Sequence, residues 1–216
     1  DKSMFDAMAN SLILASLSSF LAAIIGTLAA VGMPKVNLRG KGVVEYISTL
    51  PIMIPEIILG MVFLTFFSLI RLPFGMVTLV IAHTSFCIPY IYMMVKARLV
   101  GIDKSLAEAA KDLGASELRV FFDITLPLIL PAILSGMLLS FAMSLDDVVI
   151  SIFVTGVNTN TLPIKIYTQL KTGVTPKINA LSTLMLGTTL LIYFLSAWLG
   201  KKGLYKKDFE MEGKII

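Results

Sequence analysis

Five long apolar stretches dominate this chain and decide what it can fold into. They cover about residues 11–33, 43–70, 74–95, 128–154 and 179–199, and each is long enough to cross roughly 30 Å of hydrocarbon as a helix. Only 15% of the residues are charged, against about 25% in soluble domains, and the mean hydropathy is +0.88. The sequence therefore predicts an all-α polytopic membrane protein with five transmembrane helices.

Prolines interrupt the second of these spans. It contains Pro51 and Pro55, each of which removes a backbone donor and kinks a helix, so we expect it to be bent or broken there. Glu56 follows Pro55 directly, and the first turn of a restarted helix is a favourable place for a carboxylate. A second reading places Glu56 on a substrate pathway, because broken helices line the cavities of transporters. Both readings stay open.

Basic residues in the connections set the orientation, because Lys and Arg are enriched in cytoplasmic loops. One side of the membrane would hold 13 of the 18 basic residues and the other side only five: Lys2, Arg71, Lys165, Lys171 and Lys177. The sequence thus predicts an external N-terminus, a cytoplasmic C-terminus and a cytoplasmic segment 101–127. The net charge of +4 reflects this orientation, and we expect no nucleic-acid partner.

The segment 101–127 is the long polar island of the chain. Ser105 and Glu108 have the spacing of a capping box, and Gly114 suits the left-handed position after a helix end. Ser116 can cap a second helix, which we expect Pro127 to separate from the following span. The island is therefore predicted to form two short helices at the membrane surface.

The island resembles the signature of ABC importer permeases. Glu-Ala-Ala, three residues, Gly, nine residues and Ile-x-Leu-Pro match this signature at every defined position. The resemblance implies a MetI-like permease fold in which the two short helices couple the chain to a cytoplasmic ATPase. The residues that would carry this coupling are Glu108, Ala109, Ala110, Gly114, Ile124, Leu126 and Pro127.

Further stretches are similar to spermidine/putrescine permeases of the PotC type. They lie at 144–156, 162–167 and 179–183, and the similarity extends over essentially the whole chain. Such permeases usually have six spans, so we expect residues 1–216 to form one permease domain that lacks its first transmembrane helix. The resemblance also implies three kinds of partner: a second permease subunit, two ATPase subunits that bind ATP and Mg, and an external substrate-binding protein. It implies a location in a bacterial inner membrane and no cofactor in this chain.

Three carboxylates fall inside the predicted spans: Glu56, Asp146 and Asp147. A charged Asp at the centre of a membrane helix costs roughly 2.5–3.5 kcal/mol, and such residues usually face a bundle interior or water. No Lys or Arg lies deep in a span to neutralise them. Unbalanced acids suit a pathway for cations and would repel phosphate, sulfate or molybdate.

The fourth span, read as one continuous helix, carries a polar stripe. Its members recur every three or four residues: Gly136, Ser140, Ser144, Asp147, Ser151 and Thr155. We predict that Asp147 faces the pathway and binds an ammonium group, that Asp146 assists or contacts a neighbouring helix, and that Ser140, Ser144, Ser151 and Glu56 belong to the same pathway. The alternative is that the stripe only packs helices closely, which does not explain two adjacent carboxylates.

The remaining candidates favour transport over catalysis. His83 lies in an apolar run, which is typical of a packed, hydrogen-bonded histidine, and the chain has no phosphate-binding loop of the G-x-x-x-x-G-K-[ST] type. No metal-ligand or nucleophile–base pattern appears, so we predict a permease subunit and not an enzyme.

Three functions remain open at this point. The leading one is an ABC importer of polyamines. The alternative in the same class is an ABC importer of another cation or small solute, and the alternative from a different class is a proton-coupled secondary transporter.

Overall fold

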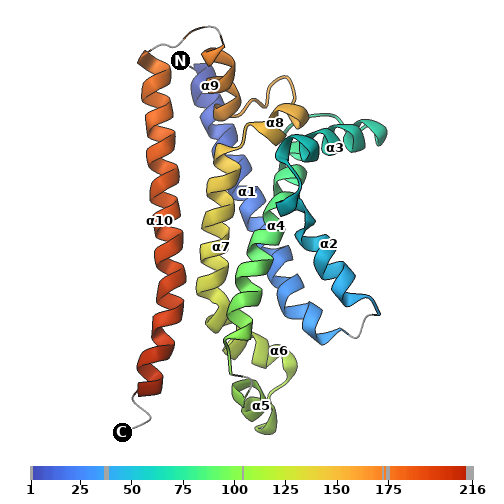
Figure 1. Cartoon of the computed structure of the whole chain (residues 1–216), viewed down its shortest axis with the longest axis vertical. Helices are drawn as coiled ribbons and strands as arrows, with labels where there is room; N and C mark the ends of the chain where they lie inside the picture. Colours follow the sequence, from blue (N-terminus) through green and yellow to red (C-terminus); the bar gives the residue numbers. More distant parts are fainter. Residues whose placement is uncertain (1, 37–38, 104, 172, 174–175, 213–216) are drawn as a thin grey trace.

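Long helices run side by side along most of the molecule (Figure 1). The computed structural model describes residues 2–36, 39–103, 105–171, 173 and 176–212, and these ranges contain helices but no β-strand. In chain order the helices are α1 (Lys2–Gly32), η1 (Met33–Lys35), α2 (Lys41–Met53), α3 (Glu56–Leu69), α4 (Met76–Val100), α5 (Ser105–Asp112), α6 (Glu117–Val120), the π-helical turn η2 (Phe121–Thr125), α7 (Leu126–Asp146), α8 (Val149–Val154), α9 (Leu162–Leu170) and α10 (Pro176–Glu212). The prediction of an all-helical membrane fold is confirmed.

Four continuous helical segments in the described chain are long and apolar enough to cross a membrane: Lys2–Lys35, Met76–Val100, Glu117–Asp146 and Ile178–Trp198. A fifth span is present if Glu45–Met53 and Glu56–Leu69 count as one, because they are separated by a bend of 113°. Ile54 takes the extended conformation at this bend, as the residue before a proline prefers. The predicted break in the second span is therefore confirmed, and α3 runs across the bundle instead of along it (Figure 1).

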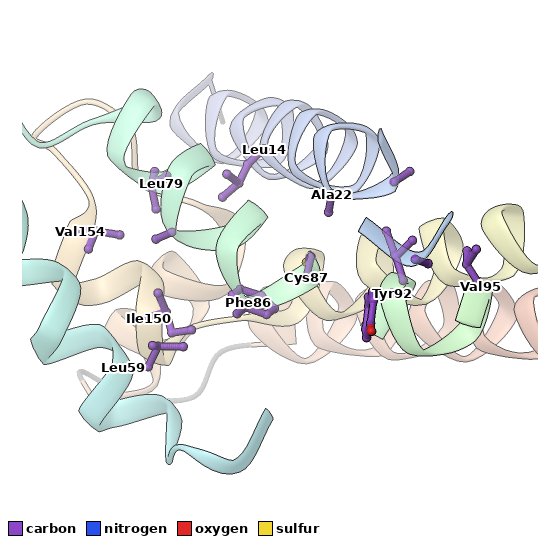
Figure 2. Packing of buried hydrophobic residues seen from close by; sticks show 14 of the residues in the cluster. Leu14, Ala22, Leu59, Leu79, Phe86, Cys87, Tyr92, Val95, Ile150 and Val154 are labelled. Atoms are coloured by element: carbon purple, nitrogen blue, oxygen red, sulfur yellow. The ribbon is translucent and has the colours of Figure 1, made fainter. Parts of the chain in front are cut away.

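The core lies where α1, α4 and α7 pack together. Figure 2 shows Leu14 and Ala22 of α1 directed toward α4, and both side chains are fully buried. A Cβ atom added at Gly26 of α1 would lie 3.1 Å from the backbone nitrogen of Tyr92, so the two helices approach closely. Small residues allow such approach between helices in a membrane. By contrast, only 6% of the most apolar part of Ile178–Trp198 in α10 is buried, so this part of the helix is available to face lipid or another subunit.

The fourth span is not the continuous helix that the sequence predicted. α7 ends at Asp146, Asp147 adopts an extended conformation (φ −67°, ψ 128°), and α8 starts again at Val149. The reason is local competition: the Asp147 side chain accepts hydrogen bonds from the backbone N–H groups of Ile150 and Ser151, and such bonds offer the chain an alternative to helix continuation.

The predicted separation at Pro127 is also wrong. α6, η2 and α7 form one continuous helical segment from Glu117 to Asp146, and Pro127 lies in the first turn of α7. Pro127 has no N–H, so it cannot donate a hydrogen bond back along this segment. The turn before it widens to the π form, in which the N–H of Leu126 bonds to the carbonyl of Phe121, five residues back.

The residues just after α8 pack against the connection between α3 and α4, at a point that leaves no room for a side chain. A Cβ atom at Gly156, just after α8, would lie 2.3 Å from the carbonyl oxygen of Phe74. We therefore expect Gly156→Ala to lower the free energy of unfolding by about 1–3 kcal/mol, the usual cost of overpacking, measured as a lower thermal midpoint in detergent. Gly187→Ala in α10 is the control, because nothing lies within 4 Å of its added methyl group. Equal midpoints for the two variants would contradict this packing.

Candidate functional site

A cavity of about 640 Å³ lies beside the break between α7 and α8. All three predicted intramembrane acids line it: Glu56 from α3, and Asp146 and Asp147 from the break. Phe86 of α4 and Tyr193 of α10 are among the residues that complete the walls, which are mainly apolar. Within the described part of the chain, no Lys or Arg lines this cavity. The structure thus brings together carboxylates that are 90 residues apart in the sequence.

Asp147 is almost fully engaged by the protein itself. Its Oδ1 atom accepts a hydrogen bond from the Ile150 N–H (3.2 Å), and its Oδ2 atom accepts one from the Ser151 N–H (2.8 Å). His83 Nε2 lies 3.4 Å from the same Oδ2 atom, and the Asp147 side chain is only 5% exposed. Asp147 therefore holds the first turn of α8, and little of its carboxylate is left for a ligand.

Asp146 has the opposite environment. It is exposed, and among the described residues no group donates a hydrogen bond or forms an ion pair with its carboxylate. Asp146 also lines a second cavity of about 250 Å³, whose walls include Tyr167 of α9 and Ser182 of α10. It is thus the carboxylate that lies where two cavities meet.

The three predicted pathway serines lie on the packed side of the span. Ser140, Ser144 and Ser151 are at most 3% exposed, and none of them lines the cavity. Ser144 and Ser151 bond to His83 of α4 (2.7 and 2.9 Å). Gly136 of the same stripe contacts Ile91 of α4, at 3.3 Å from an added Cβ. The stripe is therefore a helix-packing face, and the acid that lies off the stripe is the one exposed to the cavity.

Glu56 lies both at a helix start and at the cavity wall. It lies in the first turn of α3, where a carboxylate is favoured, and it is exposed and lines the cavity. A restarted helix has placed a charge at the wall of a cavity, as broken membrane helices do in transporters.

His83 is packed and hydrogen-bonded, as predicted, with no exposed surface. Its partners could not be identified from its own sequence neighbourhood. The available signal was the spacing of Ser144 and Ser151 around Asp147, one helical turn to either side. In the described ranges, no group of three or more His, Cys, Asp or Glu side chains is placed to hold a metal ion.

The polar island lies at the end of the bundle opposite to α8 and α9 (Figure 1). It forms two short helices, α5 and α6, with Gly114 in the left-handed region (φ +84°) between them, and Ser116 Oγ accepts from the Arg119 N–H at 3.4 Å. The cap of α5 differs from the prediction: α5 starts at Ser105, and the Ser105 N–H bonds to Asp103 Oδ1 (3.0 Å).

The signature residues of the island divide between its exposed surface and its attachment to the bundle. Glu108 and Ala109 are exposed on α5, and Ala110 is half-buried. Ile124 and Leu126 are half-buried, and Leu126 packs on the core. Leu113, which directly precedes Gly114 in the sequence, is 90% exposed.

Ion pairs fasten the island to the end of the first span. Glu117 of α6 pairs with Lys35 of η1 (3.3 Å) and with Lys111 of α5 (3.4 Å). All three side chains are half or more exposed, so solvent screens both pairs and each contributes little to stability. They orient the island more than they stabilise it.

Comparison with known proteins decides what this architecture is. Residues 22–202 match the model of the family described as binding-protein-dependent transport system inner membrane component. The chain belongs to this family. It is therefore a multi-pass membrane protein and a permease subunit of the ABC transporter class, whose ATPase is a separate subunit. Permeases of this family work with another permease, ATPases and a binding protein.

The similar proteins that are curated include polyamine permeases. The permease is 41% identical over 92% of its length to the spermidine/putrescine transport system permease protein PotC of Haemophilus influenzae, and covers 77% of that protein. It is 42% identical over 92% of its length to the putrescine transport system permease protein PotI of Escherichia coli, covering 73% of it.

Solved structures support the fold. A chain of the MetNI methionine ABC transporter in an inward-facing conformation superposes with a TM-score of 0.75 at 19% identity, over 93% of this permease and 95% of that chain. A chain of an amino acid ABC transporter gives a TM-score of 0.66 at 15% identity, over 93% and 94%. The predicted MetI-like fold is confirmed.

The different environments of Asp146 and Asp147 predict different effects of substitution on the free energy of unfolding. Asp147→Asn replaces one of the two carboxylate oxygens that accept from α8 with an NH2 group, which cannot accept, so we expect the free energy of unfolding to fall by about 1–3 kcal/mol, the cost of a buried donor left without its acceptor. Asp146→Asn removes no bond within the described chain and should change it by less than about 0.5 kcal/mol. Thermal unfolding in detergent measures both, and equal losses would contradict the assignment.

Proposed function

We propose that this chain is a permease subunit of an ATP-driven importer that carries polyamines, spermidine or putrescine, across a bacterial inner membrane. The observation that carries the proposal is the identity of 41–42% over 92% of the chain with permeases named for these two cargoes. The cavity supports it, because three carboxylates and no cationic side chain from the described residues line its wall.

The chemistry of the cavity matches a flexible alkylammonium chain. Ammonium groups bond most strongly to carboxylates, and Asp146 and Glu56 are the two exposed acids of the wall. Aromatic faces such as that of Tyr193 also attract cations, and the apolar wall between the acids suits methylene segments. A few separated acids hold such a cargo without the dense contacts that would prevent its release.

The island supplies the link to the energy source. In this proposal α5 and α6 lie in the cytoplasm and seat on one of two ATPase subunits, which bind ATP and Mg, and this chain needs no cofactor of its own. The expected contacts are three exposed apolar side chains, because apolar residues grouped on an exposed surface mark a protein-binding site. They are Leu106, Leu113 and Leu118 (49%, 90% and 72% exposed).

The proposal also gives the orientation and the other partners. The N-terminus of the chain would be external and the C-terminus cytoplasmic. A second permease subunit and an external binding protein complete the importer.

A different cargo is the alternative within the same class. A relative at 31% identity over 77% of the chain is the molybdenum transport system permease protein ModB of Haemophilus influenzae, so the family carries more than one cargo. The acids favour another cation over an anion. A proton-coupled secondary transporter would use Asp146 and Asp147 as proton carriers, but it leaves the match of the island to the coupling signature without a purpose.

Reconstitution tests the cargo. The permease, its permease partner and the ATPases in proteoliposomes should hydrolyse ATP faster when a binding protein loaded with spermidine or putrescine is added. Asp146→Asn should raise the half-saturating cargo concentration about tenfold, because one charged hydrogen bond is worth roughly 1.5–3 kcal/mol, and Asp146→Glu should retain most of the affinity. No response to either polyamine would contradict the cargo, and an unaffected Asp146→Asn variant would contradict the role of Asp146.

A substitution at Leu113 tests the proposed contact between the island and the ATPase. Leu113→Asp places a charge on the most exposed leucine of the island, so we expect cargo-stimulated ATPase activity to fall about tenfold or more, the size of one hot-spot contact, with unchanged insertion into the membrane. The neighbouring exposed Asp112→Asn is the matched control and should remain stimulated. Full stimulation of the Leu113→Asp transporter would show that the island is not the contact.

A further inference from the structure

One buried imidazole connects both halves of the broken fourth span to the helix beside them. His83 projects from α4, where its Nδ1 atom lies 2.7 Å from Ser144 Oγ of α7 and its Nε2 atom lies 2.9 Å from Ser151 Oγ of α8. Nε2 also lies 3.4 Å from Asp147 Oδ2, at the break itself. The same ring therefore contacts the end of one half, the start of the other and the residue between them.

Both ring nitrogens of His83 have a hydroxyl partner. A serine hydroxyl can donate or accept, so Ser144 and Ser151 can bond to the ring in either neutral tautomer. The contact with both helix ends therefore does not require one particular tautomer.

His83 cannot act by touching a ligand in the cavity. Its side chain is fully buried, and it is not among the residues that line the cavity. Phe86, which lies 5.2 Å from the His83 ring between ring centres, does line it. The influence of His83 on a bound cation must therefore pass through the residues that it holds.

We infer that His83 is a positioning residue: it clamps the ends of α7 and α8 so that Asp147 stays on the amides of α8 and Asp146 stays turned toward the cavity. Ser144, which His83 holds, lies two residues before Asp146 on the last turn of α7. The role of Asp146 as a cation contact rests on the proposed function, whereas the clamp itself does not.

The clamp explains why an imidazole occupies this position. Its two nitrogens lie on opposite edges of one rigid ring, so a single side chain can fix the separation of two helix ends. A phenylalanine fills a similar volume with no hydrogen bond, and it would leave the buried hydroxyl groups of Ser144 and Ser151 without their partner. In a membrane interior such groups have no water to replace it.

A cysteine at position 146 reports the clamp independently of cargo. Cys87 is the only cysteine of the chain, so Asp146→Cys in a Cys87→Ala background gives one thiol, whose reaction rate with a cationic methanethiosulfonate is measured in the assembled transporter. His83→Phe should slow this rate about fivefold, the factor that one buried hydrogen bond contributes to a conformational equilibrium, and Ser144→Ala should slow it in the same direction.

Thr84→Val is the matched control, because Thr84 is the next residue of α4, is buried, and has a hydroxyl with no partner among the described residues. Its labelling rate should stay within about twofold of the parent. An unchanged or faster rate in His83→Phe, or equal slowing in Thr84→Val, would overturn the clamp. If His83→Phe does not insert, Ser144→Ala decides by the same criterion. The proposed cargo is tested separately in the parent transporter with Asp146 intact: no stimulation by spermidine or putrescine there, with labelling as predicted here, would refute the cargo and leave the clamp standing.

Discussion

The hydrogen bonds from the amides of Ile150 and Ser151 to the Asp147 carboxylate are the interaction on which the rest of this structure depends. A membrane span can be broken only where the freed backbone groups find partners inside the protein, because hydrocarbon offers none. Asp147 supplies two of these partners, and His83 holds the carboxylate from α4. The break in turn brings α8 against α3 and leaves Asp146 at the end of α7, exposed to the cavity. The structural role of Asp147 thus leaves Asp146 at the end of α7, where it is exposed to the cavity.

The cavity and the polar island lie toward opposite ends of the bundle (Figure 1). Asp146 and Glu56 line the same cavity beside the break between α7 and α8, whereas α5 and α6 project from the opposite end (Figure 1). Between them, α4 and α7 pack closely in the core and are the helices that connect island and cavity. A displacement of the island by a partner would reach the break through α7, because α6, η2 and α7 form one continuous helical segment. The helical continuity at Pro127 thus joins the island directly to the break.

Features set by local chemistry could be predicted from the sequence. The bend after Ile54 follows from Pro55, and the turn at Gly114 follows from its tolerance of a positive φ. The break at Asp147 could not be predicted, because a carboxylate that caps a helix and one that meets a ligand are the same residue type. Helical periodicity selected Asp147 as the acid open to the pathway, whereas Asp146 is the more exposed of the two at the cavity. The contact of His83 with Ser144 and Ser151 joins residues 61 and 68 positions apart, and no short-range pattern encodes it.

A structure of the complete transporter with spermidine trapped inside tests the division of the two acids most directly. The account predicts a cargo nitrogen about 2.7–2.9 Å from an oxygen of Asp146, the usual length of an ammonium–carboxylate hydrogen bond. It also predicts that Asp147 remains bonded to the amides of Ile150 and Ser151. A cargo nitrogen on Asp147, with those amide bonds released and Asp146 turned away, would contradict it.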